Sequence, residues 1–202
     1  IYKPLITNKE KKYVNECLDE GWISSKGRFV NEFEYKFSEY LNLNHSVSTT
    51  SGTTALHLAM LALDIKKGDE VILPSLTFVA TANAISYTGA TPVFADCEED
   101  TYVLNVSNLN KYITPKTKAR VAVHLYGNAC DMDSLVEFCN KNNIYLIEDC
   151  AEAIGTMYKN QAVGTFGDIS CFSFYGNKTI STGEGGMVCT DSLEFAEKIT
   201  LF

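Results

Sequence analysis

The alternation of short apolar segments with helical patterns most constrains how this chain can fold. Strand-like segments at 70–73, 91–95, 119–124 and 145–147 alternate with helical patterns at 77–87, 107–113 and 131–140. Strands that are apolar throughout and separated by helices are typical of a mostly parallel sheet covered on both faces. Ligands of such sheets bind beyond the carboxyl ends of the strands. We therefore expect one α/β domain over residues 1–202, with its site at that edge.

Two further helices are predicted before this region. Residues 7–10, Thr-Asn-Lys-Glu, have the spacing of a capping box, and the helix that follows should end at Gly21. A second amphipathic pattern covers residues 29–40. The loop between them carries three candidates for substrate contacts, although a tryptophan there could equally pack on the core. They are Trp22, Lys26 and Arg28.

The charge balance argues against nucleic acid as a partner. The chain has 17 Lys and Arg against 25 Asp and Glu, a formal net charge of -8, whereas binding to phosphate backbones needs clustered cations. Its only arginines are Arg28 and Arg120. An anion site must therefore depend on backbone N–H groups, hydroxyls and helix N-termini.

The seven cysteines include no C-x-x-C pair, and most lie in apolar segments. This pattern predicts reduced, buried thiols in a cytoplasmic protein, without a disulfide framework or a zinc site. No segment resembles a signal peptide or approaches membrane-spanning length. The helical pattern at 198–202 has no stop signal, from which we expect a truncated chain.

Three places carry residues suited to chemistry. The first is Ser51-Gly-Thr-Thr-Ala55, which opens a nearly all-apolar helix. Small hydroxyl residues and a glycine at a helix N-terminus can bind a phosphate with free N–H groups. Ordinary capping by Ser or Thr is the alternative.

The second place is the carboxyl end of the strand at 145–147, where Glu148, Asp149 and Glu152 follow. This position lies on the ligand side of the sheet. The acid spacing fits no hard-cation loop, so we expect no metal there. A carboxylate that pairs with a protonated ring nitrogen is the other interpretation.

The third place is Lys178, between an apolar strand ending at Phe174 and the glycine-rich turn 183–186. A lysine there can reach a bound aldehyde, although most loop lysines are simply solvated. Pyridoxal phosphate needs all three features: a phosphate cup, an acid for its ring nitrogen and a lysine for its aldehyde.

A series of spaced motifs extends this interpretation over essentially the whole chain. They are Ser51-Gly-Thr-Thr-Ala-Leu-His57, Gly68-Asp-Glu-Val-Ile72, Pro74-Ser-Leu-Thr-Phe-Val-Ala-Thr81, Gly89-Ala-Thr-Pro-Val93, His124-Leu-Tyr-Gly127, Glu148-Asp-Cys-Ala-Glu-Ala153 and Phe172-Ser-Phe with Lys178 and Gly183-Glu-Gly-Gly186. Together they resemble the DegT/DnrJ/EryC1/StrS nucleotide-sugar aminotransferases of fold-type I. Residues 22–27, 148–153 and 176–179 are most similar to the GDP-perosamine synthase branch.

The resemblance implies a role for each matching residue. Lys178 would be the covalent anchor and proton carrier, and Asp149 would hold the ring-nitrogen proton. Phe78 would stack on the ring, and Glu152 would stand near the ring hydroxyl, where many members carry Gln or His and the perosamine branch carries Glu. The phosphate would be held by Gly52, Thr53, Thr54 and Ser173.

The resemblance also implies an activity and partners. The amino group of glutamate would move to C4 of a nucleotide-linked 4-keto-6-deoxy sugar, in the perosamine branch GDP-4-keto-6-deoxy-D-mannose, for O-antigen of lipopolysaccharide. A UDP- or dTDP-linked sugar is the alternative substrate. We expect a cytoplasmic homodimer with shared active sites, without membrane or nucleic-acid partners. The chain would comprise an N-terminal segment and the cofactor-binding large domain, and lack the small C-terminal domain.

Three rival interpretations remain to be weighed. Sugar dehydratases of this fold resemble these proteins but carry His in place of the lysine, so Lys178 argues against them. A nicotinamide-dependent oxidoreductase lacks support because no G-x-G-x-x-G follows the first strand. A catalytically silent family member or fragment is opposed by the intact lysine, acid and cup.

Overall fold

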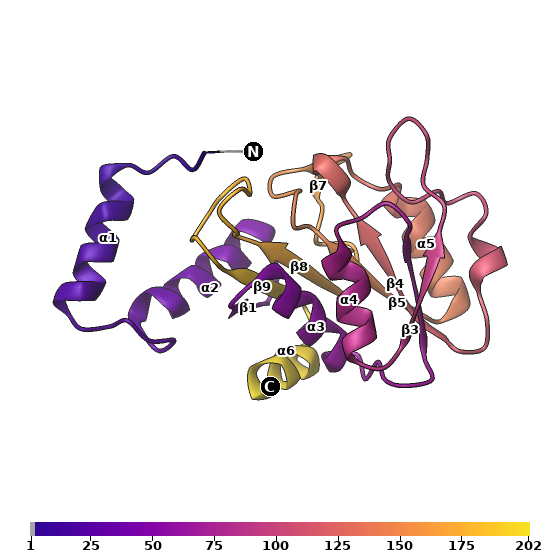
Figure 1. Ribbon diagram of the computed structural model, residues 1–202, viewed down its shortest axis with the longest axis horizontal. Coiled ribbons are helices and arrows are strands. Elements are labelled where there is room, and N and C mark those ends of the chain that lie inside the picture. The colour runs from indigo at the N-terminus through magenta and orange to yellow at the C-terminus, as the bar shows by residue number, and fades with distance from the viewer. Residues whose placement is uncertain (1–2) are drawn as a thin grey trace.

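A computed structural model describes residues 3–202 and contains a seven-stranded sheet at its centre (Figure 1). In chain order the strands are β1 (His45–Thr49), β2 (Glu70–Pro74), β3 (Thr91–Ala95), β4 (Thr117–Val123), β5 (Tyr145–Asp149), β8 (Ile169–Ser173) and β9 (Gly186–Thr190). They lie in the order β1-β9-β8-β5-β4-β2-β3. The five strands from β8 to β3 are parallel, whereas β9 is antiparallel to both of its neighbours. The predicted mostly parallel α/β sheet is confirmed.

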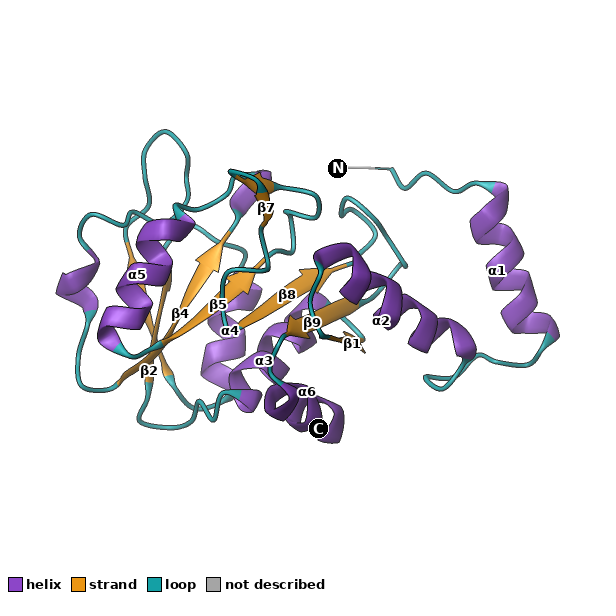
Figure 2. Ribbon diagram, turned by 180° about the vertical axis from the view of Figure 1, so that it is seen from behind, coloured by secondary structure: helices purple, strands orange, loops and turns teal. Residues whose placement is uncertain are grey.

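Helices cover both faces of this sheet (Figure 2). One face packs against α3 (Gly52–Ala62), α4 (Val79–Tyr87) and α6 (Leu193–Leu201). The other face packs against α2 (Arg28–Leu41) and α5 (Met132–Asn142). Burial on both sides explains why the central strands are apolar throughout.

The pleat of β5 places its two terminal carboxylates on opposite faces. Ile147 packs in the cluster beneath α3 and α4, and Leu146 packs in the cluster beneath α5. Because successive side chains alternate along a strand, Asp149 shares the face of Ile147, and Glu148 shares the face of Leu146. The functional difference between the two acids begins with this alternation.

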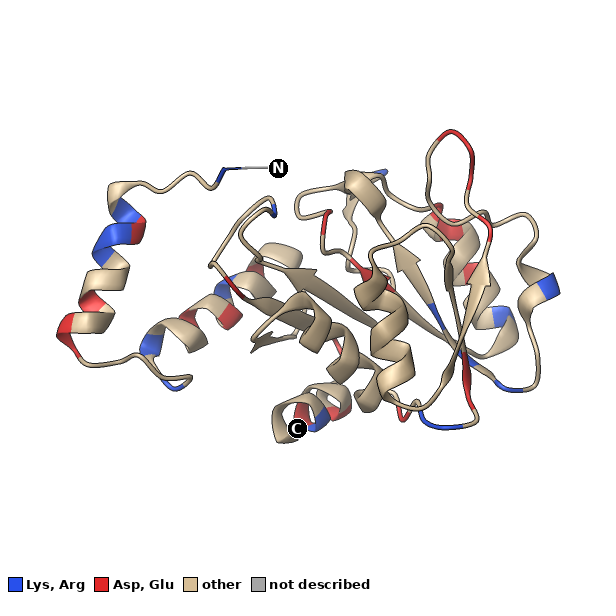
Figure 3. Cartoon of the chain, in the orientation of Figure 1, with Lys and Arg blue, Asp and Glu red and all other residues tan. Residues whose placement is uncertain are grey.

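The N-terminal helix α1 (Asn8–Asp19) projects from the body and has no buried residue (Figure 1). Its predicted capping box is present, with both Thr7 and Glu10 in their expected roles. Figure 3 shows charges of both signs along this helix, while the strands are largely uncharged. Few contacts tie α1 to the chain that follows, among them a 5.0 Å contact between the rings of Tyr13 and Phe29.

Three details of the fold differ from the sequence prediction. The helix expected at 107–113 is a single 3-10 turn, η1 (Leu109–Tyr112), because Pro115 closes a stretch too short for more turns. The hairpin of β6 (Met157–Tyr158) and β7 (Gln161–Ala162) was missed because its strands are only two residues long. β5 continues past residue 147, so Asp149 is its last residue.

All seven cysteines lie among the described residues and are free thiols, as predicted. Five of them are buried, namely Cys130, Cys139, Cys150, Cys171 and Cys189. Burial raises the pKa of the Cys139 and Cys150 thiols to about 12. No helix in the described part of the chain is long and apolar enough to cross a membrane.

Candidate active site

A cavity of about 510 Å³ lies at the carboxyl ends of β4, β5 and β8. It brings together residues that are as far apart as 51 and 184 in the sequence. Its lining includes every cofactor-binding residue expected from the sequence except Thr54, namely Gly52, Thr53, Phe78, Asp149, Glu152, Ser173 and Lys178. The parallel sheet therefore gathers the lysine, the acid and the helix N-terminus at one place.

The start of α3 forms the wall suited to an anion. Ser51 caps the helix, and its hydroxyl accepts the N–H of Thr54 at 3.1 Å. The N–H groups of Gly52 and Thr53 precede the first helical hydrogen bonds, so they have no partner within the helix. The hydroxyl of Thr54 lies instead within 3.2 Å of those of Thr50 and Ser51. Its role in phosphate binding remains a prediction.

Glycine is required at position 52 because α3 begins directly against the end of β8. A Cβ atom there would come within 2.7 Å of the Cβ of Ser173. This close approach brings the Ser173 hydroxyl beside the free N–H groups of the helix. Together with the Ser51 and Thr53 hydroxyls and the positive end of the helix dipole, they suit a phosphate group without any guanidinium.

Asp149 forms the opposite wall and is only 5% exposed. The hydroxyl of Thr81 donates to its Oδ2 at 2.8 Å, and the Ala151 N–H donates to its Oδ1 at 3.1 Å. Burial raises the pKa of Asp149, and these two hydrogen bonds oppose the rise. A desolvated carboxylate that faces a cavity is stabilised by a cation there, so a protonated ring nitrogen fits this position.

Lys178 reaches the cavity from the loop after β8. Its Nζ lies 3.2 Å from Oε1 of Glu152, and the lysine side chain is 17% exposed. The other oxygen of Glu152, Oε2, accepts the backbone N–H of Tyr126 at 3.0 Å. Sequence reasoning placed Glu152 in the site but missed both contacts, since they join segments that only the fold brings together.

Phe78 stands at the N-cap of α4, with 70% of its surface exposed, and lines the same cavity. An aromatic ring at this position can cover one face of a planar ligand. The stacking role expected from the resemblance remains a prediction.

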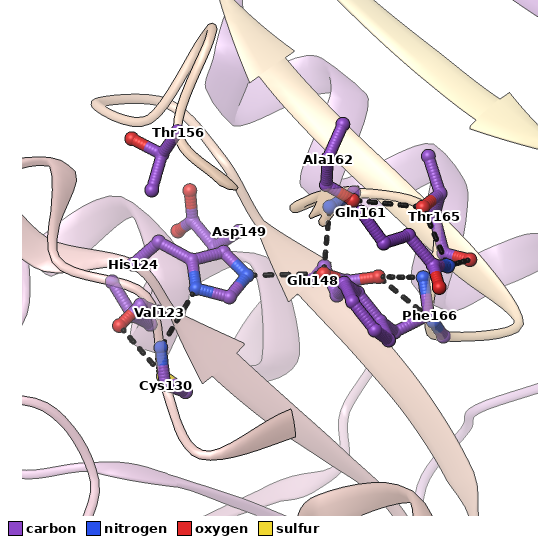
Figure 4. A network of polar contacts seen from close by, with 12 residues as sticks. Val123, His124, Cys130, Glu148, Asp149, Thr156, Gln161, Ala162, Thr165 and Phe166 are labelled. Atoms are coloured by element: carbon purple, nitrogen blue, oxygen red, sulfur yellow. Dashed lines mark hydrogen bonds and ion pairs between the residues drawn. The ribbon is translucent and has the colours of Figure 1, made fainter. Parts of the chain in front are cut away.

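Glu148, by contrast, does not face the cavity, although the sequence interpretation put the acids of this strand end on the ligand side. It is fully buried on the α5 face (Figure 4). Its carboxylate accepts the backbone N–H groups of Gly164, Phe166 and Gly167, each at 2.7 Å. A fourth contact, at 3.0 Å, is to Nε2 of His124. The pleat of β5 is the reason for the difference.

His124 is held on both sides of its ring. Its Nδ1 accepts the N–H of Cys130 at 3.2 Å, so the ring proton is assigned to Nε2, which donates to Glu148. The Cys150 thiol lies close enough to these two residues to share a metal ion with them. The hydrogen-bond donors around Glu148 nevertheless account for its geometry without one.

The three loop candidates for substrate contacts do not line the cavity. Trp22, Lys26 and Arg28 belong to the projecting N-terminal part, and Arg28 pairs with Glu16 at 2.7 Å. The other arginine, Arg120, is fully buried, with its guanidinium 5.2 Å from the Phe138 ring centre. The described cavity therefore contains no arginine, as the scarcity of this residue suggested.

Comparison with known families agrees with this geometry. The model of the DegT/DnrJ/EryC1/StrS aminotransferase family matches residues 4–202. The chain belongs to this family. The family resemblance inferred from the spaced motifs is confirmed, and so is the fold class.

Individual relatives are similar over almost the whole chain. The GDP-perosamine synthase of Escherichia coli O157:H7 is 57% identical over 191 residues, which are 95% of this chain and 52% of the relative. The GDP-perosamine synthase of Vibrio cholerae is 52% identical over 95% of this chain. An aminotransferase structure from Psychrobacter cryohalolentis has a TM-score of 0.93 and 37% identity, and covers 99% of this chain and 51% of its own. The chain thus spans about half the length of its relatives.

Proposed function

We propose that this chain is the cofactor-binding large domain of a pyridoxal-phosphate-dependent sugar-nucleotide aminotransferase. The observation that carries the proposal is the meeting of Lys178, buried Asp149 and the start of α3 around one cavity. The three features match the three chemical demands of pyridoxal phosphate. In the longer protein, a small C-terminal domain would follow.

The names of relatives support a particular substrate. Proteins called GDP-perosamine synthase share 57% and 52% identity with this chain. For the cofactor, a similar sugar aminotransferase structure from Streptococcus pneumoniae, with a TM-score of 0.91, is a PLP form. We infer that the full-length protein transfers the amino group of glutamate to C4 of GDP-4-keto-6-deoxy-D-mannose, giving GDP-perosamine. This product would serve O-antigen synthesis in the cytoplasm.

When bound, pyridoxal phosphate supplies an electron-withdrawing ring that stabilises negative charge on a neighbouring carbon. The residues of this chain make that useful. Asp149 would keep a proton on the ring nitrogen, because its carboxylate is buried and would be stabilised by a cation at that atom. The N–H groups of Gly52 and Thr53, with the Ser173 hydroxyl, would hold the phosphate. Phe78 would cover one face of the ring.

Lys178 would hold the aldehyde of the bound cofactor and would then be free to carry a proton. Its Nζ reaches the cavity from a loop whose own backbone is fixed, since the Lys178 N–H donates to the Tyr175 carbonyl at 2.9 Å. A primary amine positioned in this way can take a proton from a substrate carbon and return it to another. Glu152 lies beside that amine and beside the place proposed for the ring hydroxyl.

The proposal includes a homodimer with shared active sites. Two large aromatic side chains that line the cavity are exposed, Phe78 at 70% and Tyr175 at 50%, and Leu76, two residues before Phe78, is 44% exposed. Such residues are suited to burial against another subunit. Analytical ultracentrifugation of the full-length protein tests this part of the proposal.

The cofactor assignment is tested by reducing the full-length protein with borohydride in the presence of pyridoxal phosphate. We expect loss of visible absorbance and a phosphopyridoxyl adduct on Lys178, mapped by peptide mass spectrometry. Lys178→Arg, which keeps the charge but cannot form the link, is the matched control and should carry no adduct. An adduct on another lysine of the unmodified protein would contradict the assignment.

The substrate assignment is tested by supplying glutamate with GDP-, dTDP- and UDP-linked 4-keto-6-deoxy sugars in parallel. We expect amino-sugar product, detected by mass spectrometry, with the GDP-linked substrate. Conversion of only a dTDP- or UDP-linked sugar would overturn the choice of nucleotide while leaving the aminotransferase proposal intact.

A further inference from the structure

The turn after β4 is the most unusual backbone feature near the cavity. Tyr126 has φ 54 and ψ 23, and Gly127 follows with φ 82, so two consecutive residues adopt left-handed conformations. Tyrosine is sterically disfavoured in this region. Its side chain is 75% exposed, so core packing does not account for the conformation.

Hydrogen bonds on both sides of the turn account for it instead. The Gly127 N–H donates to the His124 carbonyl at 3.2 Å, and the Thr156 hydroxyl donates to the Gly127 carbonyl at 3.0 Å. The ring of His124 is in turn held by Glu148, with 3.0 Å between Nε2 of His124 and Oε2 of Glu148 (Figure 4). The turn is therefore anchored to the buried network under the sheet.

The left-handed conformation directs the Tyr126 N–H toward Glu152, whose Oε2 accepts it at 3.0 Å. This leaves Oε1 of Glu152 to face Nζ of Lys178 at 3.2 Å. A carboxylate held at one oxygen by a backbone donor cannot turn freely, so its second oxygen has a defined direction. Unusual backbone conformations retained beside a cavity commonly serve such a purpose.

We propose that the turn at Tyr126 and Gly127 is a positioning element that sets Glu152 against Lys178. The inference rests on the proposed function, because it assigns this turn to the site in which Lys178 binds the cofactor. Tyr126 acts through its backbone N–H, so its side chain is not required. With the cofactor bound at Lys178, Oε1 of Glu152 would keep this orientation and could accept a hydrogen bond from a ligand hydroxyl.

The test is a double-mutant cycle in the full-length protein. Gly127→Ala strains the turn without a collision, since a Cβ there would lie 3.5 Å or more from its neighbours. Glu152→Gln removes the charge that faces Lys178. Gly68→Ala is the matched control: it also substitutes a left-handed glycine with open space around it, at the opposite end of the strands from the cavity.

The primary measurement is the rate at which pyridoxal phosphate becomes reducible onto Lys178, with kcat and KM recorded beside it. We expect Gly127→Ala to slow this capture by about tenfold, because small displacements of reacting groups have large kinetic effects. Gly68→Ala should leave it unchanged. Glu152→Gln should also slow capture, and adding Gly127→Ala to it should cause little further loss, since both act through one contact.

Hydrogen exchange at the Tyr126 amide provides a second readout that is independent of turnover. We expect protection in the unmodified protein and in Glu152→Gln, which keeps an acceptor oxygen, and at least about tenfold faster exchange in Glu152→Ala. The inference would be overturned by equal capture rates for Gly127→Ala and Gly68→Ala. It would also be overturned if the fold-reductions in capture rate caused by Gly127→Ala and Glu152→Gln multiplied in the double mutant, or if the Tyr126 amide were unprotected. Failure of the unmodified protein to capture pyridoxal phosphate at Lys178 would instead overturn the proposed function.

Discussion

The two sides of the end of β5 carry adjacent carboxylates in contrasting surroundings. Glu148 has four hydrogen-bond partners and no exposure, and it joins His124 to the loop at 164–167. Asp149 has two partners and faces a cavity. A buried carboxylate with every oxygen satisfied stabilises the fold. One left under-satisfied beside a cavity is available to a ligand.

The largest expected effect is the loss of turnover when the Asp149 carboxylate, which faces the cavity, is neutralised. Asp149→Asn keeps the shape of the site and its contact with Thr81, but removes the charge that holds a proton on the ring nitrogen. We expect the full-length variant to bind pyridoxal phosphate and to lose about 10³-fold in kcat. Steady-state kinetics with the accepted sugar nucleotide, beside absorbance of the bound cofactor, measures both. Full activity would refute the role assigned to Asp149.

Neutralising Glu148, whose carboxylate oxygens all accept hydrogen bonds, should instead destabilise the fold. In Glu148→Gln, the amide NH₂ group faces N–H donors that previously had an acceptor. We expect the free energy of unfolding to fall by about 3 kcal/mol, measured by urea denaturation of the cofactor-free protein. A loss no larger than that of Glu99→Gln, a substitution at an exposed position, would show that Glu148 does not act as a structural anchor.

A smaller and opposite effect on stability is expected at Asp149. Burial raises the pKa of Asp149 in the folded state, so its ionised form costs stability at pH values above its ordinary pKa of 3.8. Asp149→Asn should therefore stabilise the cofactor-free protein at neutral pH. The gain should disappear as the pH falls below 3.8, where both states of the protein carry a protonated Asp149. Urea unfolding at several pH values checks the sign, and a destabilised variant at neutral pH would contradict it.

The same contrast explains which parts of the site could be predicted from the sequence. The sequence predicted Asp149, Lys178 and the start of α3 because each stands at a recognisable strand end, loop or helix start. Topology alone brings such positions to one edge of a parallel sheet. The order of strands and helices could also be predicted, because hydrophobic periodicity encodes it directly.

The remaining features depend on contacts that no local pattern contains. The strand β5 ends at 149, two residues beyond the predicted end at 147, so Glu148 lies within the strand and its side chain points to the face opposite Asp149. The Tyr126 amide reaches Glu152 only because of a left-handed turn at a non-glycine residue. The prediction that Trp22, Lys26 and Arg28 contact the substrate also depended on how the N-terminal part folds back, and in this structure α1 projects away (Figure 1).

The buried thiols give this protein an internal chemical reporter. Cys171 and Cys189 lie on the adjoining strands β8 and β9, Cys150 directly follows β5, and burial raises the pKa of each thiol. Since only the thiolate reacts quickly with alkylating reagents, these buried thiols should not be alkylated while the central strands remain folded. Their modification rate under native conditions would therefore count opening events of the central strands. Slower labelling with cofactor present would measure how strongly ligand binding at one edge holds the whole sheet together.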